Sequence, residues 1–539
     1  SVDSSLIKIN KLKLSNKSQS ISVDGSINKN QNDKLNLIFN QVDLRSLNHF
    51  IGDDIELSGE LDGVLSIFDI YQQPLFLTDL KVANLGLLGQ ALGEANIQSR
   101  WDRDAKEIDG DLQIKENKKE LLHAFGIYNP EKDSLSIYSN FNHFSLMILQ
   151  PLMGSSFTNF HGDATGKVWI HGPSGHIKHD GALYASNAGL MLTDLQANYT
   201  LNDSVRFSRD KIIFPDIKVH DDYGNTGIFS GSIQHRSFSK MVYDLTVKTE
   251  KGGKILAINT TPAINEQFYG KMFGSGLVKI TGKGAQILIS GAARTEKGTE
   301  MNIYLEYEGE AQEYDFLNFI SHGYQPKKPV LSYQNDDSDV QMKFDVQVTP
   351  EAKAQLIYNS KIGDVIKSQG TGNLQVNIDN DYNISLFGQY TVEQGDYLFT
   401  LQNVINKKFD IEQGGTIEWN GDPEVATINL NAIYRLKASL NELFASNSGT
   451  TYNQRIPVLC KINLTKNLTN PEIKFNIELP TTETRVRDEV AQYISSEEDM
   501  NKQILSLLVL GKFYTPEYLR GSYSSSNNNV VGSTASELF

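Results

Sequence analysis

Apolar and polar residues alternate along most of this chain. Rows of alternation cover residues 135–141, 301–307, 374–378, 384–392, 456–464 and 473–479. Because successive side chains of a β-strand point to opposite faces, a period of two is typical of strands with one apolar and one polar face. Turn-forming pairs such as Asn129-Pro130 and Gly414-Gly415 separate the rows at short spacing. The pattern predicts an all-β protein built as an antiparallel meander.

Helical periodicity is confined to three stretches. Residues 145–154 and 314–320 each predict one short helix, and residues 482–513 form a longer stretch with apolar residues at helical spacing. Gly511 suits the end of that last stretch, because glycine readily adopts the left-handed conformation found there. Residues 521–534 are rich in serine and asparagine and predict a flexible linker.

One strand pattern recurs about every hundred residues. Residues 39–70 align with residues 141–172 at an offset of 102 or 103 residues. The aligned positions are Gly59, Gly63, Leu65 and Ile67 in the first copy, Gly162, Gly166, Val168 and Ile170 in the second, and Gly276, Val278 and Ile280 in a partial third. Glycine within a strand marks a bend or a bulge. We therefore predict stacked repeats of one unit whose strands bend at these glycines.

A one-sided sheet poses a packing problem, because its apolar face must be covered. Helices are too few before residue 480 to cover it. A second sheet could face it, or each strand could bend until its two arms face each other. If the two arms close on each other, they enclose an ordinary core. If they stay apart, they leave a lengthwise apolar groove. The sequence does not decide between these two arrangements. The aligned apolar residues are the first candidates for groove lining: Leu65, Ile67, Val168, Ile170, Val278 and Ile280.

Composition and charge narrow the classes of function. The chain has 539 residues, of which 39% are hydrophobic, so the sequence favours a thin molecule or a row of small units over one thick core. The formal net charge of −15 argues against a nucleic-acid partner. A lone cysteine, Cys460, excludes an internal disulfide and a cysteine-based zinc site.

Motifs for catalysis or cofactor binding are weak. Residues 162–168 lack the spacing and the Ser or Thr of a phosphate-binding loop. Four histidines within 161–179 have no carboxylate pattern that completes a zinc site, so we expect surface histidines. Asp379 and Asp381 lack the glycine and the final glutamate of a calcium loop. We therefore expect that the protein is not an enzyme and that it has no cofactor and no metal site.

Residues 370–480 resemble the C-terminal region of the TamB family of translocation and assembly module proteins, most closely its Bacteroidota-type members. The resemblance lies in the pairs Gly388-x-Tyr390 and Gly395-x-Tyr397 and in the segments LQNVINKKF (401–409), GGTIEWNGDP (414–423) and YRLKASL (434–440). The upstream repeats resemble the AsmA-like portion of the same superfamily of bridge-like lipid transfer proteins.

The resemblance implies an elongated, U-shaped antiparallel β-sheet, called a β-taco, with few short helices. It divides the chain into AsmA-like repeating groove units at 1–320, a TamB-like C-terminal groove at 321–480, a helical segment at 481–520 and a flexible linker at 521–539. The family's N-terminal membrane anchor and its extreme C-terminal part do not occur in this sequence, so we expect a segment of a longer protein.

Alternate apolar residues of the resembling block are further candidates for groove lining. They are Ile384, Leu386, Tyr390, Tyr397, Phe399, Leu401, Phe409, Ile411, Ile417 and Trp419. Ordinary buried packing is the alternative for all of them. Ile504, Leu507 and Leu508 belong to a stretch too apolar all round for a solvated helix, so we expect them to dock on a partner or to plug the groove. Packing on the chain's own sheet is the alternative here.

The resemblance also implies a function in the periplasm. The family's groove is thought to carry phospholipid between the inner and outer membranes. Its C-terminal end is thought to meet a TamA-like outer-membrane β-barrel, and an N-terminal anchor holds it in the inner membrane. We therefore expect a non-catalytic, periplasm-spanning conduit with phospholipid in its groove. The alternatives are a scaffold for outer-membrane protein assembly that offers a sheet edge to client strands, and a purely structural spacer.

Overall fold

The fold is all-β, with a many-stranded sheet and a few short helices, as the sequence predicts. The computed structural model describes residues 6–28, 33–48, 56–69, 75–305, 339–358, 365–381, 383–401, 405–444 and 454–515. The chain divides into two compact units. Unit 1 comprises Ser1–Ile255, Leu277–Ile289 and Leu331–Val340, and unit 2 comprises Leu256–Gly276, Ser290–Val330 and Gln341–Phe539.

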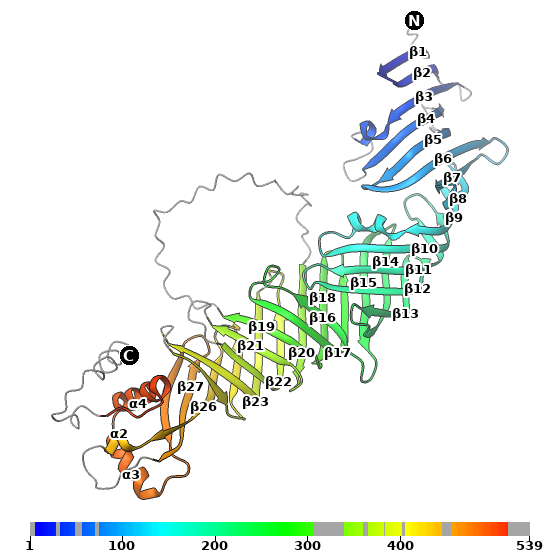
Figure 1. Ribbon diagram of the computed structural model, residues 1–539. Helices are drawn as coiled ribbons and strands as arrows, with labels where there is room; N and C mark the ends of the chain where they lie inside the picture. The colour runs from blue at the N-terminus through cyan, green and yellow to red at the C-terminus, as the bar shows by residue number, and fades with distance from the viewer. Residues whose placement is uncertain are drawn as a thin grey trace. The chain divides into compact units, whose positions relative to one another are not determined.

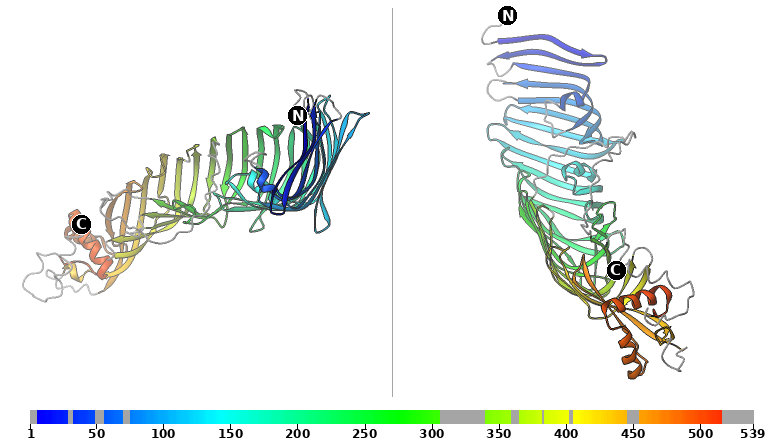
Figure 2. Two further views of the ribbon diagram at one scale, coloured as in Figure 1. Left: turned by 90° about the horizontal axis from the view of Figure 1, so that it is seen from above. Right: turned by 90° about the vertical axis from the view of Figure 1, so that its left-hand side faces the viewer.

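Unit 1 is an antiparallel meander in which each strand from β1 to β15 pairs with the next (Figure 1). Figure 2 shows these strands side by side in chain order. They are β1 (Leu6–Asn16), β2 (Gln19–Asn28), β3 (Lys34–Asp43), β4 (Leu57–Phe68), β5 (Leu75–Leu87), β6 (Gln90–Asp102), β7 (Glu107–Glu116), β8 (Lys119–Asn129), β9 (Ser134–Ser145), β10 (Phe157–Gly172), β11 (Lys178–Leu192), β12 (Ala197–Arg209), β13 (Lys211–Asp221), β14 (Thr226–Arg236) and β15 (Ser239–Thr249). Strands β16 (Ile255–Thr260), β17 (Phe268–Lys283) and β18 (Gln286–Thr295) contribute residues to both units, and β15 pairs with residues 277–283 of β17.

Bulges interrupt the strands of unit 1 at repeated positions. The bulged residues with positive φ include Gln41, Asn84, His143 and Asn187. The backbone N–H of Gln41 donates to Asp62 Oδ1 at 2.9 Å, and that of His143 donates to Thr165 Oγ1 at 3.0 Å. A bulge bends its strand and increases its twist. Equivalent bends therefore recur at the offset of 102 or 103 residues that the sequence shows.

The repeated glycines lie where a neighbouring strand leaves no room for a side chain. Gly63 and Gly166 have φ of +124° and +151°, which L-residues rarely adopt. A Cβ atom would lie 2.1 Å from the carbonyl oxygen of Asp79 at Gly63, and 2.2 Å from that of Ala182 at Gly166. The register shifts between Ser58 and Glu60 and between His161 and Asp163, so the prediction of a bulge is confirmed at Gly59 and Gly162. Gly63 and Gly166 instead mark places of close approach between strands.

Two 3₁₀ helices follow the bulges of β3 and β9. In η1 (Leu44–Leu47) the side chain of Asp43 accepts a hydrogen bond from the backbone N–H of Arg45. In η2 (Leu146–Leu152) Ser145 caps the helix in the same way. The short helix predicted at 145–154 is confirmed as a 3₁₀ helix, which suits a segment that contains the N–H-deficient Pro151.

The remaining strands belong to unit 2, apart from Asp339 and Val340 at the start of β20, which belong to unit 1. They are β19 (Glu300–Leu305), β20 (Asp339–Val348), β21 (Lys353–Tyr358), β22 (Val365–Ile378), β23 (Ile384–Leu401), β24 (Ile405–Ile411), β25 (Thr416–Gly421), β26 (Thr427–Ser439), β27 (Arg455–Asn467) and β28 (Pro471–Glu478). β19 and β21 pair in parallel, because β20, which separates them in the chain, pairs with β22 instead. This parallel pair corrects the prediction of a wholly antiparallel meander.

Helices pack on the last strands of unit 2 (Figure 1). They are α2 (Asn441–Phe444), α3 (Thr484–Tyr493) and α4 (Glu497–Leu510). α4 begins after Ser496, whose side chain accepts a hydrogen bond from the backbone N–H of Asp499, and ends at Gly511, which has a φ of 67°. The helical stretch predicted at 482–513 is therefore confirmed as two helices. The helix predicted at 314–320 and the linker predicted at 521–534 lie outside the described residues.

Candidate functional site: the apolar face of unit 1

The apolar face of unit 1 follows from the register of its strands. Residues directly opposite each other in neighbouring strands project from the same side of a sheet. Following these partners from β1 to β17 gives one continuous line, which we name the central row. It runs through Leu14, Ile21, Phe39, Gly63, Leu80, Ile97, Leu112, Ala124, Ser139, Val168, Gly181, Phe207, Ile212, Ile233, Tyr243 and Gly282.

Two further rows flank the central row on the same face. The first runs through Leu12, Val23, Leu37, Leu65 and Thr78, and then through Ser99, Gly110, Gly126, Ile137, Ile170, His179 and Arg209. The second runs through Val42, Leu61, Val82, Ala95, Ile114, Leu122, Phe141, Gly166, Leu183 and Val205. Along these three rows, the described residues include one permanently charged side chain, that of Arg209 at the end of β12.

The central row is apolar but is not sealed from water. Leu80, Ile97 and Ile233 are partly exposed, and Leu14 is 65% exposed. In a closed core, side chains of this size lose their contact with water, as Phe409 of unit 2 does at 0% exposure. The face of unit 1 is therefore an accessible apolar surface.

One side of this face is packed more tightly than the centre. Five residues of the second flanking row form a buried cluster with Leu44 and Leu92: Val42, Leu61, Val82, Ala95 and Ile114. Leu44 belongs to η1, so the 3₁₀ helix covers this side of the face near the first strands. Burial here gives the bent strands a small core of their own and leaves the central row accessible.

The structure places all six upstream lining candidates on the apolar face: Leu65, Ile67, Val168, Ile170, Val278 and Ile280. Val168 lies in the central row and is 8% exposed, and the other five are partly exposed. Sequence analysis missed most of the central row. The alternation of apolar and polar residues is visible in the sequence of many strands. The sequence does not show which residues of neighbouring strands lie opposite each other.

The downstream lining candidates belong to a closed core in unit 2. Tyr390, Tyr397, Phe399, Phe409, Ile411, Ile417 and Trp419 are at most 7% exposed. They share one cluster with side chains of α3 and α4, and Leu386 packs against it. Ile384 is partly exposed, and the side chain of Leu401 lies outside the described residues. For this block the structure shows buried packing rather than an accessible groove, because helices pack on the apolar face.

The candidates for partner docking lie in the same core. Ile504, Leu507 and Leu508 are 1%, 1% and 2% exposed, so they pack on the chain's own sheet. This corrects the expectation that they present an apolar surface to a partner. The exposed apolar residues of α4 are Val509 and Leu510, at 46% and 50%.

Two aromatic residues of this core form hydrogen bonds within it, and its cysteine is buried. The Tyr390 hydroxyl donates to Ser368 Oγ at 3.2 Å, and Trp419 Nε1 donates to the Pro423 carbonyl at 3.1 Å. Burial raises the pKa of the Cys460 thiol to about 12. A thiol with so high a pKa stays protonated at neutral pH and is a poor nucleophile.

The histidines of residues 161–179 do not form a metal site. His171 pairs with Asp180 at 2.8 Å, and His176 pairs with Asp210 at 2.9 Å. His179 is 2% exposed, so the prediction of surface histidines is wrong for this residue. Within the described ranges, no group of three or more His, Cys, Asp or Glu side chains is arranged to hold a metal ion.

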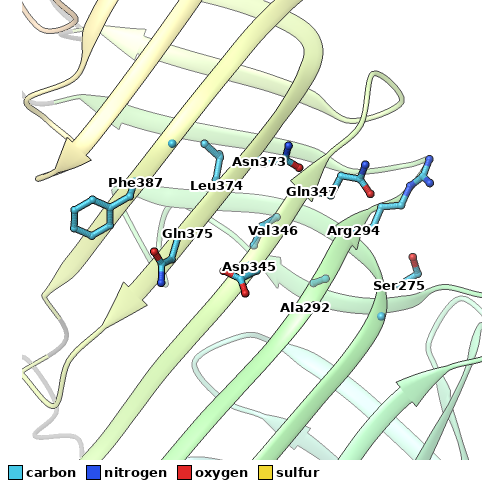
Figure 3. A pocket seen from close by; sticks show the side chains of 13 residues that line it. Ser275, Ala292, Arg294, Asp345, Val346, Gln347, Asn373, Leu374, Gln375 and Phe387 are labelled. Atoms are coloured by element: carbon cyan, nitrogen blue, oxygen red, sulfur yellow. The ribbon is translucent and has the colours of Figure 1, made fainter.

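A separate hollow of about 830 Å³ lies in unit 2 (Figure 3). Its lining includes Arg294, Asp345, Gln347, Asn373 and Gln375, whose side chains are exposed. The alternate residues of these strands are apolar and face the other side. Phe387, the cross-strand partner of Gln375, lines the hollow on the same face as these polar residues. The hollow therefore offers apolar surface beside hydrogen-bonding groups.

Comparison with known proteins identifies the family. A sequence model of the TamB C-terminal domain matches residues 216–539, more than half of the chain. The chain belongs to the TamB family. TamB membership connects the chain to the translocation and assembly module, a membrane-associated system of the cell envelope with a transport role. The match with TamB confirms the resemblance found in residues 370–480.

The search of curated proteins gives no match to this chain. None of the helices in the described part of the chain has the length and the apolar character needed to cross a membrane.

Proposed function

We propose that this TamB chain is a non-catalytic conduit for phospholipid, in which acyl chains lie along the central row while headgroups stay in water. The observation that carries the proposal is the accessible, charge-free central row from β1 to β17. An extended apolar surface in contact with water favours an apolar occupant. TamB membership supports the rest of the proposal: a location in the periplasm, an inner-membrane anchor, and a TamA-like outer-membrane β-barrel as partner.

The apolar face suits a sliding chain better than a fixed ligand. Burial of one methylene contributes about 0.8 kcal/mol, so an acyl chain of about 16 carbons gains roughly 10 kcal/mol in gross terms. Neighbouring strands lie about 4.8 Å apart, so similar apolar contacts recur at short intervals along the row. Recurring contacts keep the gain nearly constant as a chain moves, because no single position binds much more tightly than the next.

Charge on the apolar face tests this proposal. We expect Val168→Glu combined with Ile170→Glu to abolish co-purification of phospholipid and to weaken the outer-membrane barrier, because two carboxylates in the row disfavour acyl chains. Native mass spectrometry measures the bound lipid, and sensitivity of cells to large antibiotics measures the barrier.

Lys167→Glu is the matched control for this experiment. It changes the net charge by the same amount, and Lys167 is an exposed residue of the same strand that points to the opposite face. We expect this variant to keep its lipid and its barrier function. Normal lipid content and a normal barrier in the double glutamate variant would exclude the conduit.

An exposed sheet edge favours the assembly scaffold as a second candidate. Among the described strands, β1 pairs with β2 alone, and its Leu12 is 53% exposed. Edge strands of this kind recruit further strands. Under this alternative the double glutamate variant would keep its barrier function, and client strands would crosslink to β1.

A further inference from the structure

A buried contact between two histidines joins strands that are not neighbours in the sheet. His179, near the start of β11, and His235, near the end of β14, are 2% and 3% exposed. Their Nε2 atoms lie 2.6 Å apart. Strands β12 and β13 separate β11 from β14 in the sheet. The contact therefore holds the ends of β11 and β14 together across the β12–β13 hairpin.

Hydrogen bonds around the pair fix the proton positions of the neutral state. The backbone N–H of Phe238 donates to His235 Nδ1 at 3.1 Å, so the neutral ring of His235 carries its proton on Nε2. That proton is donated to His179 Nε2. His179 then carries its own proton on Nδ1, which is buried and has no hydrogen-bond partner.

Protonation of either ring disrupts this arrangement. A second proton on His235 would sit on Nδ1 and oppose the N–H of Phe238. A second proton on His179 would sit on Nε2 and oppose the N–H of His235. The protonated ring would also be buried among aromatic rings, since Phe238 stacks on His235 at 4.6 Å and Phe207 contacts His179 at 5.3 Å. Burial of a charge in such surroundings is costly.

The charged groups near the pair do not remove this cost. Arg209, the cross-strand partner of His179 on β12, has a guanidinium group that can only donate hydrogen bonds, so it offers no acceptor to a further proton on the pair. Asp210, in the β12–β13 turn, pairs with His176, and its carbonyl accepts from the backbone N–H of His235. Burial lowers the pKa of His235, His179 lowers it further, and Asp210 opposes the change.

We propose that the His179–His235 contact is a pH-sensitive latch, closed when both rings are neutral and opened when either ring is protonated. A second bond, from the backbone N–H of Ile177 to Ser237 Oγ at 3.0 Å, joins the same two segments. Because His179 packs against Phe207 of the central row, opening uncovers this part of the apolar face. The latch is independent of the proposed conduit, and its effect on lipid access rests on that proposal.

The direction in which pH shifts the opening equilibrium depends on whether the open or the closed state binds protons more strongly. The open state binds a proton on His235 at the ordinary histidine pKa of about 6.5, whereas the closed state lowers the pKa of His235. Closure is therefore fully stable above that pH and weakens below it. Between pH 7.5 and pH 5.5 the opening equilibrium rises about tenfold, because His235 is kept neutral in the closed state.

Hydrogen–deuterium exchange of the whole chain tests the latch. We expect peptides that cover 173–180 and 233–240 to exchange about ten times faster at pH 5.5 than at pH 7.5, after correction for intrinsic rates. The variant His179→Phe with His235→Phe keeps an aromatic cluster and should lose this response. His123→Gln removes a partly exposed histidine of unit 1 that pairs with Asp111, and should keep it.

Two results would overturn the latch. One is a change of less than twofold in the corrected exchange rates of the wild-type protein between pH 7.5 and pH 5.5. This result excludes the latch even if the phenylalanine variant fails to fold. The other is an undiminished rise in exchange at pH 5.5 in the folded phenylalanine variant, which would show that groups other than His179 and His235 cause it. Loss of lipid binding with a normal exchange response would count against the conduit and leave the latch intact.

Discussion

At the scale of single residues, unit 1 depends on positions where the backbone leaves the regular strand conformation. Bulged residues such as Gln41 and His143 bend the strands, and Gly63 and Gly166 lie where the next strand approaches too closely for a Cβ atom. The sequence predicted these glycines because they recur at one offset. It did not predict Gln41 or His143, because no glycine marks them and a side-chain oxygen on the next strand supports each bulge.

Replacement of a repeated glycine should destabilise unit 1 strongly. For Gly63→Ala we expect a loss of about 2 to 4 kcal/mol in the free energy of unfolding, because the new Cβ meets the Asp79 carbonyl and the φ is unfavourable. Urea denaturation followed by circular dichroism measures the loss.

Gly110→Ala is the control for that change. Gly110 is also a strand glycine on the apolar face, but its Cβ would have no neighbour within 4 Å. We expect a change of less than about 1 kcal/mol here. Equal losses in the two variants would show that close approach does not explain why these glycines recur in the repeat.

At the scale of elements, the two units treat their apolar faces differently. In unit 1 the central row stays accessible, whereas in unit 2 the helices α3 and α4 pack into a cluster that includes Phe409 and Val458 at 0% exposure. Periodicity predicted the apolar faces and the C-terminal helices. It could not distinguish lining from core, because a strand has the same period of two whether its apolar side faces a helix or water.

Packing of α4 on its own sheet gives a stability test. We expect Leu507→Ala to lower the free energy of unfolding of unit 2 by about 3 kcal/mol, because it removes a side chain that is 1% exposed. Leu510→Ala, at a position 50% exposed, should cost less than about 1 kcal/mol. Thermal unfolding compares the two variants, and an unchanged melting temperature for Leu507→Ala would mean that α4 does not stabilise this core.

At the scale of the whole molecule, the proposed function depends on membership of the TamB family and on the central row of unit 1. TamB membership gives a transport role in the cell envelope, and the central row gives the surface along which transport is proposed. The resemblance of residues 370–480 predicted the family from sequence alone. The residues of the central row could not be predicted, because they become neighbours through hydrogen bonds between strands and not through spacing in the chain.

Site-specific photo-crosslinking in cells tests the central claim most directly. A photoreactive amino acid at Leu80 or Ile233, both in the central row, should form adducts with phospholipid. The same probe at Lys81 or Gln234, the exposed neighbours that point to the other face, should form none. Lipid adducts confined to Leu80 and Ile233 are the result that the account predicts. Equal labelling at all four positions, or no lipid adduct at Leu80 and Ile233, would contradict it.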